Sequence, residues 1–182
     1  MNSYAGEYPK TAQEFALLPP YCKAKMQPSS PAEQQLWSKR IGDGFGHIHH
    51  YCAALNSLRE AQGIYGKDKE SLMVKTSMLR SSVINNISYM EKNTSPSAII
   101  MPHIYTTKAE AYLMLGQTGE AFEYFNKAIK ANRKFTKPYA LMSDYYVKIN
   151  NKKDALEILK KGLKYSPRSK QLKRRLKKLS KK

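Results

Sequence analysis

Acidic residues are scarce in this chain, and their scarcity is uneven. Its 182 residues hold 14 Asp and Glu against 32 Lys and Arg, a formal net charge of +18. Residues 1–125 contain 12 basic and 11 acidic side chains, whereas residues 126–182 contain 20 basic and 3 acidic ones. The sequence therefore predicts a near-neutral body with a cationic C-terminal third, whose field would attract anionic partners.

Long apolar runs are also absent. No stretch approaches the roughly 20 residues that a helix needs to span a bilayer, and Met1 to Lys10 lacks the apolar core of a signal peptide. A mature exported protein would begin in the same polar way, so export and the cytoplasm both stay open. With 41% hydrophobic residues, the chain carries enough apolar material for a folded core.

The motifs of the common enzyme classes are missing. The sequence contains no GxSxG, no Walker A loop, no HExxH and no GxGxxG. Its few carboxylates are scattered along the chain. We therefore expect a protein that is not an enzyme and that holds no cofactor.

Cysteine is rare, but the stretch HIHHYC combines one cysteine with three of the four histidines. In a helix, His49 and Cys52 share a face, whereas His50 points about 100° away from His49. The histidines are therefore expected to diverge. A metal or redox site built from His47, His49, His50 and Cys52 is the third functional alternative, and it would need ligands from other segments.

The two cysteines, Cys22 and Cys52, have no CxxC spacing and allow two interpretations. A bridge would close a loop of about 30 residues and stabilise the fold by about 2–4 kcal/mol. Two buried free thiols are the other interpretation. The bridge would tether the proline-rich N-terminal segment to the first long helix.

Residues 1–46 are expected to be largely irregular because five prolines interrupt them, with LPPYC extended or in a turn. One short helix should begin at Pro31, with Ser30 as its N-cap, and bury Leu36 and Trp37. GDGFG then breaks the chain before the next helix.

Two further helices are predicted over residues 47–65 and 69–92 by apolar residues recurring at three- and four-residue steps. The first would bury a face running from Ile48 to Ala61. The expected apolar side of the second consists of Leu72, Met73, Met78 or Leu79, Val83, Ile87 and Met90.

An internal repeat of 34 residues follows. It pairs aromatic and apolar knobs, such as Tyr105 with Tyr139 and Phe125 with Leu159. It also pairs small residues at expected helix crossings, such as Ala128 with Gly162. The segments YTTKAEAYLMLGQTGEAFEYFNKAIKANRKF and YALMSDYYVKINNKKDALEILKKGLKYSP resemble the tetratricopeptide repeat, with Arg133 at the usual proline position and Asn150 at the usual glycine position.

The resemblance implies an all-α, right-handed superhelical solenoid. Residues 102–135 and 136–169 would form two repeats. Residues 47–101 would supply a degenerate helix pair, and residues 170–182 a basic capping helix. In this helix Leu172, Leu176 and Leu179 line one stripe, which is expected to pack against the last repeat.

Carried over by position, the resemblance implies a groove that binds a segment of a partner protein. The groove residues would be His103, Thr106, Glu110, Leu113, Lys137, Asp144, Lys148, Arg174 and Lys178. Thr106, Glu110, Ala140 and Asp144 stand where chaperone adaptors carry a Lys and Asn clamp, which argues against an adaptor of that kind. The groove is expected to be acidic near Glu110 and Asp144 and basic toward Lys148.

The pairing of LPPYC with HHYC is similar to a group of small exported bacterial tetratricopeptide proteins. This similarity implies the periplasm, favours the Cys22–Cys52 bridge and suggests a part in a cell-envelope assembly. The alternative function is anion binding through the C-terminal cations, with a phosphate-rich polymer or a membrane surface as partner. No specific nucleic acid is expected, and the sequence indicates no oligomeric state.

Overall fold

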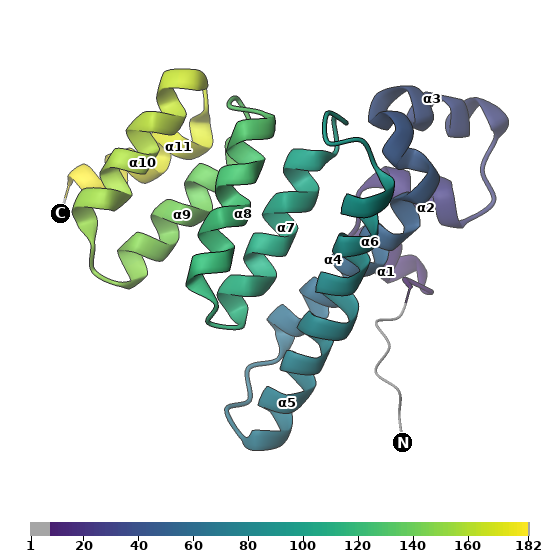
Figure 1. Cartoon of the computed structure of the whole chain (residues 1–182), viewed down its shortest axis with the longest axis horizontal. Helices are drawn as coiled ribbons and strands as arrows, with labels where there is room; N and C mark the ends of the chain where they lie inside the picture. The colour runs from purple at the N-terminus through teal and green to yellow at the C-terminus, as the bar shows by residue number, and fades with distance from the viewer. Residues whose placement is uncertain (1–7, 182) are drawn as a thin grey trace.

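The computed structural model describes residues 8–181, and every regular element in that range is helical (Figure 1). The helices follow one another in a row, from α1–α3 near one end to α11 at the other (Figure 1). This arrangement confirms the expected all-α solenoid. Most of the polar stretch on which the signal-peptide expectation depends lies outside the described residues. Within them, no helix is long and apolar enough to cross a membrane.

The N-terminal segment holds three helices where one was expected. α1 (Ala12–Ala16) begins with a capping box, in which Thr11 and Glu14 each accept a hydrogen bond from the other's backbone amide. α2 (Pro20–Met26) has a proline in its first turn, where a missing amide donor costs nothing. The expectation of irregular structure at LPPYC is therefore wrong, because its second proline opens a helix.

α3 (Pro31–Ile41) is the helix that the sequence predicts, with Ser30 as its N-cap. Trp37 is half-buried and packs edge-on against Tyr21 of α2, with ring centroids 5.7 Å apart. Leu36 is 44% exposed, so its expected burial is wrong. Only one side of α3 is covered by the neighbouring elements.

η1 (Gly42–His47) is a short 3-10 helix that leads into α4 (Ile48–Gly63). Gly44 packs so closely that a Cβ there would lie 2.9 Å from the side chain of Ile100 and 3.0 Å from that of Thr94. The apolar face of α4 is buried as predicted. Its fully or nearly buried members are Ile48, Tyr51, Cys52, Leu58 and Ala61.

α5 (Lys69–Ser77), η2 (Met78–Ile84) and α6 (Asn85–Asn93) form one rod where a single α-helix was expected. η2 is a π-helical segment, and the α5 end of the rod projects beyond α7 and α8 (Figure 1). Leu72 and Met73 are 50% and 63% exposed, so their expected place on a buried side is wrong. Both residues belong to α5, which lies at the projecting end of the rod and buries none of its residues.

The repeat region consists of two antiparallel helix pairs. α7 (Met101–Met114) pairs with α8 (Thr118–Ala131), and α9 (Lys137–Lys148) pairs with α10 (Lys152–Tyr165). The small and large residues of the repeat pattern are buried as predicted. They include Ala109, Ala121, Phe125, Ala128, Tyr139, Ser143, Ala155, Leu159 and Gly162.

The turns inside the two pairs share one backbone geometry although their residues differ. Gly116 has φ 75° and Asn150 has φ 58°. This left-handed conformation favours glycine, and asparagine is among the few other residues that adopt it readily. Asn150 therefore takes the structural role of the glycine that the repeat resemblance expects there.

α11 (Lys170–Ser180) closes the solenoid. Leu172 is fully buried and the other two leucines of α11 are half-buried within the same cluster. Gly162 of α10 allows this close packing, since a Cβ there would lie 2.7 Å from Leu172 and 2.9 Å from the ring of Tyr139. The leucine stripe of α11 therefore packs inward, as expected of a capping helix.

Two hydrophobic clusters divide the interior. One joins α2, the end of α3, η1, α4, η2, α6 and part of α7, and the other joins α7 to α11. α7 contributes to both, through Ala111 and Ala109 respectively. At their boundary the buried Lys108 of α7 forms an ion pair with Glu91 of α6, and its ammonium lies 4.6 Å from the ring centroid of Tyr124 on α8.

Candidate partner-binding site

The predicted groove residues lie on α7, α9 and α11, and we call the sides of these helices that carry them the inner face. His103, Lys148, Arg174 and Lys178 are exposed. Leu113 is half-buried and packs against the second hydrophobic cluster. Most of the predicted side chains are therefore accessible to a partner.

Thr106 is the exception. Its side chain is fully buried, and its hydroxyl donates a hydrogen bond of 2.7 Å to the carbonyl of Pro102 one turn earlier. The prediction that Thr106 contacts a partner is wrong for this conformation, because helix packing covers the residue. Ala140, which occupies the equivalent position in the next repeat, is 1% exposed.

The carboxylates of the inner face are occupied by cations of the same chain. Glu110 forms an ion pair of 2.5 Å with Lys137, which links α7 to α9. Asp144 accepts two hydrogen bonds from Arg175, of 2.9 Å and 2.7 Å, which link α9 to α11. The expected acidic stretch is therefore neutralised, and the unpaired charge on this face is positive.

Arg175 is the residue of this face that the sequence analysis missed. Its guanidinium donates two hydrogen bonds to the carboxylate of Asp144, which lies 31 residues earlier in the chain. This contact raises the pKa of Arg175. The available signal was helical phase, since Arg175 lies between Leu172 and Leu179 at the edge of the buried stripe. The 34-residue spacing does not predict this contact, because Arg175 does not lie one repeat after Lys137, the partner of Glu110.

His103 begins the inner face at the start of α7. Its ring packs against Phe135, with centroids 4.4 Å apart. Partial burial, followed by the nearby charge of Lys137, lowers the pKa of His103. The neutral ring therefore offers a partner hydrogen-bonding nitrogens at neutral pH, without adding to the positive charge.

The histidines of HIHHYC lie together, so the expectation that they diverge is wrong. The ring centroid of His50 lies 4.4 Å from that of His49 and 3.9 Å from that of Tyr89 on α6. His47, which precedes the first turn of α4, lies 5.5 Å from the same tyrosine ring. Helical phase fixes where each side chain starts, but His47 and His50 both turn toward the ring of Tyr89, and His49 packs against His50.

This histidine cluster does not assemble a metal site. Within residues 8–181, no three His, Cys, Asp or Glu side chains are placed to hold a metal ion. The Nδ1 of His50 lies 2.7 Å from the amide oxygen of Asn86. Burial, and then the neighbouring His50, lowers the pKa of His49.

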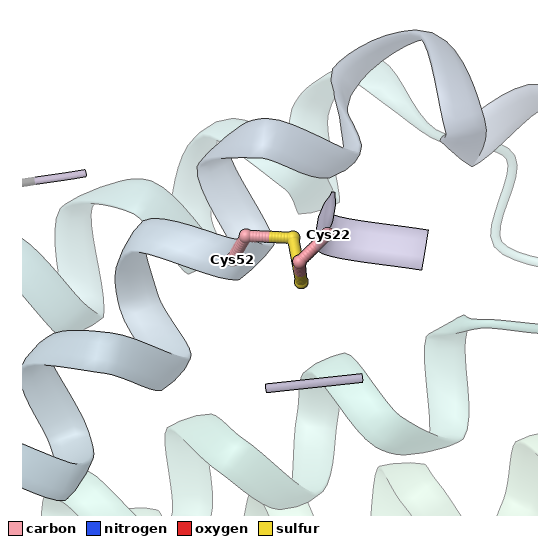
Figure 2. The surroundings of a disulfide bond; sticks show 2 residues. All are labelled: Cys22 and Cys52. Atoms are coloured by element: carbon pink, nitrogen blue, oxygen red, sulfur yellow. A yellow bond between two sulfur atoms is a disulfide. The ribbon is translucent and has the colours of Figure 1, made fainter. Parts of the chain in front are cut away.

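Cys52, the remaining residue of the metal alternative, is joined to Cys22 by a disulfide bond that links α4 to α2 (Figure 2). The two Cα atoms lie 5.7 Å apart, and both side chains are fully buried. The bond therefore holds α2 directly on the buried face of α4, inside the first hydrophobic cluster.

The helix pairs and their turns define a class of interaction domain. The tetratricopeptide repeat family model matches residues 102–135 and 136–169, so the chain carries two tetratricopeptide repeats. Such repeats generally mediate protein–protein interactions and are typically not enzymes. No curated protein and no solved structure matches the chain at a significant level.

Proposed function

We propose that this protein is a non-enzymatic scaffold that binds a segment of another protein along its inner face. The observation that carries the proposal is the pair of stacked tetratricopeptide repeats capped by α11. Their first helices present side chains at regular steps along one face, as an extended segment requires. Ion pairs between α7 and α9 and between α9 and α11 support a preformed surface.

The partner would meet neutral, apolar and cationic groups in order along the inner face. His103 offers ring nitrogens, Leu113 offers partly exposed apolar surface, and Lys148, Arg174 and Lys178 offer exposed charge. Glu110 and Asp144 would act by fixing the spacing between helices, because their charges are already paired.

The experiment is site-specific photo-crosslinking in native cells. A photoreactive amino acid at position 148 should capture the partner, whereas the same amino acid at position 160, an exposed lysine of the outer helix α10, should not. Partner capture at both positions or at neither would contradict a groove site. Capture at position 148 that still occurs when a cell extract is irradiated at about 0.5 M salt would separate groove binding from purely electrostatic attraction, because salt of this strength screens the encounter before the covalent bond forms.

We further propose that the protein works in an oxidising compartment of a bacterial cell envelope, such as the periplasm. The disulfide between two fully buried cysteines supports this proposal, because such bonds persist mainly outside the reducing cytosol. Protein isolated with its thiols blocked should gain the mass of two protons on reduction. Protein whose thiols are already alkylated at isolation would point instead to the cytoplasm.

A further inference from the structure

The outward side of α11 is an unbroken stripe of cations. Lys170, Lys173, Arg174, Lys177 and Lys178 are all exposed, as is Lys181 at the end of the helix. The leucines of α11 lie on the opposite side and pack into the second cluster. α11 contains no acidic residue, so nothing on the helix itself offsets the charge.

The rest of the described chain does not neutralise this stripe either. Across residues 8–181, the only α11 cation in an ion pair with an acidic side chain is Arg175, which points toward α9. Of the three acids in residues 126–182, Asp144 is taken by that pair, and neither Asp154 nor Glu157 on α10 forms an ion pair with a cation of α11 within the described residues. The stripe therefore presents its full charge to solvent.

The form of the stripe indicates what it fits. It is straight and about 16 Å long, from 11 residues at about 1.5 Å each. It lies at the C-terminal end of the helix row (Figure 1), where no further described element covers it. A straight, uncovered row of charges at the end of the folded domain fits a broad anionic surface better than it fits a small ligand bound in a pocket.

The residue types separate a lipid surface from a nucleic acid. Five of the six cations are lysines, which act as hydrated point charges suited to a diffuse field, whereas arginine forks suit bidentate phosphate recognition. α11 carries no aromatic side chain on which a base could stack. Its leucines are committed to packing, so attachment would be electrostatic, without insertion into the acyl region.

We infer that the α11 stripe docks this protein on an anionic phospholipid surface. The stripe overlaps the inner face only on α11, so a scaffold docked in this way keeps the α7 and α9 parts of its inner face available. Arg174 and Lys178 lie where the stripe meets the inner face, and they would be shared by the two surfaces.

The test is flotation of the full, disulfide-bonded chain with vesicles of phosphatidylcholine containing about 30% phosphatidylglycerol, at low salt. A triple variant, Lys170→Gln, Lys177→Gln and Lys181→Gln, should bind about 100-fold more weakly, because each lysine near such a surface contributes about 1 kcal/mol. The matched control is Lys152→Gln, Lys153→Gln and Lys160→Gln on α10, which removes the same charge from exposed positions.

The outcomes decide the inference in either direction. Binding to anionic vesicles that is lost in the α11 variant, kept in the α10 variant and reversed by about 0.5 M salt supports it. Equal loss in both variants overturns it, because the whole cationic third would then act without a defined stripe. Absence of vesicle binding overturns it too, as does tighter binding of a single-stranded oligonucleotide than of the vesicles.

Discussion

The two halves of the molecule are held together in different ways. From α7 to α11, cohesion comes from small residues that let helices approach and from large residues that fill the remaining space, as Gly162 and Tyr139 show. From α1 to α6, the hydrophobic cluster is supplemented by a disulfide bond and by buried polar contacts such as that between Ser57 and Ser82, whose hydroxyl oxygens lie 2.7 Å apart. A repeated pattern can be satisfied by residue size, whereas a segment packed once needs specific links.

Charge follows the same division. The repeat half carries nearly all of the net positive charge, and most of that charge lies on exposed side chains. The N-terminal half is close to neutral and keeps its polar groups for internal contacts. The difference suggests that one half supplies structure at the end of the solenoid and the other supplies the surfaces that meet partners.

Breaking the disulfide should have the largest effect. Cys22→Ser combined with Cys52→Ser should lower the free energy of unfolding by about 2–4 kcal/mol, because the bond restricts a loop of about 30 residues in the unfolded chain. Hydrogen exchange should report faster opening in α1–α4 and little change in α9–α11. Equal loosening of both halves would show that the disulfide does not act on the N-terminal half alone.

Removing Glu91 tests the ion pair at the boundary between the halves. Lys108 has a side chain only 6% exposed, so Glu91→Ala leaves a buried ammonium without its carboxylate and should cost about 2 kcal/mol in chemical denaturation. Glu123→Ala is the control, because it removes an exposed pair with Lys127 and should cost about 0.5 kcal/mol. Similar losses for both variants would rule out a special role for the boundary pair.

A methyl group at Gly162 tests packing by residue size. Gly162→Ala should destabilise the repeat half by about 1–2 kcal/mol, since the clash with Tyr139 and Leu172 exceeds the gain in helix propensity. At Gly119 in α8 a Cβ would meet nothing within 4 Å, so Gly119→Ala should be neutral or slightly stabilising. Thermal unfolding of the two variants decides the point, and equal melting temperatures would count against tight packing at Gly162.

Of the four changes, acidification should have the smallest effect, and it should destabilise α1. Hydrogen bonds from the backbone amides of Thr11 and Lys10 lower the pKa of Glu14 from 4.5 to about 2. Stability from this carboxylate is thus present above pH 4.5 and is lost as pH falls toward 2. NMR titration of Glu14 checks the pKa, and a value near 4.5 would refute the capping box. Asn151, which caps α10, does not titrate and serves as the comparison in the repeat half.

The same division separates what the sequence predicts from what it does not. The 34-residue spacing predicts the buried Tyr139, Phe125 and Gly162, because each repeated position has one structural role. The helical period also predicts the buried face of α4. These features are local or periodic, so residue type and spacing are enough to find them.

The rest depends on contacts between segments that share no period. The contact of His47 and His50 with Tyr89 and the pairing of Asp144 with Arg175 each depend on how separate helices meet. The helix at Pro20 is not predicted because a pair of prolines also fits an extended or turn segment, and the residue before a proline disfavours the helical conformation. The groove residues other than Thr106 and the two proposed functions stay predictions for the experiments above.

The Cys22–Cys52 bond also makes residues 22 to 52 a covalent ring that contains all of α3 and η1. A protease that cuts the exposed residues of α3 would leave one molecule of two chains, with its mass raised by a single water. On a gel without reductant such a nicked protein would stay in one piece, and reductant would release a fragment of some 30 to 40 residues. Limited proteolysis compared with and without reductant therefore maps this ring directly.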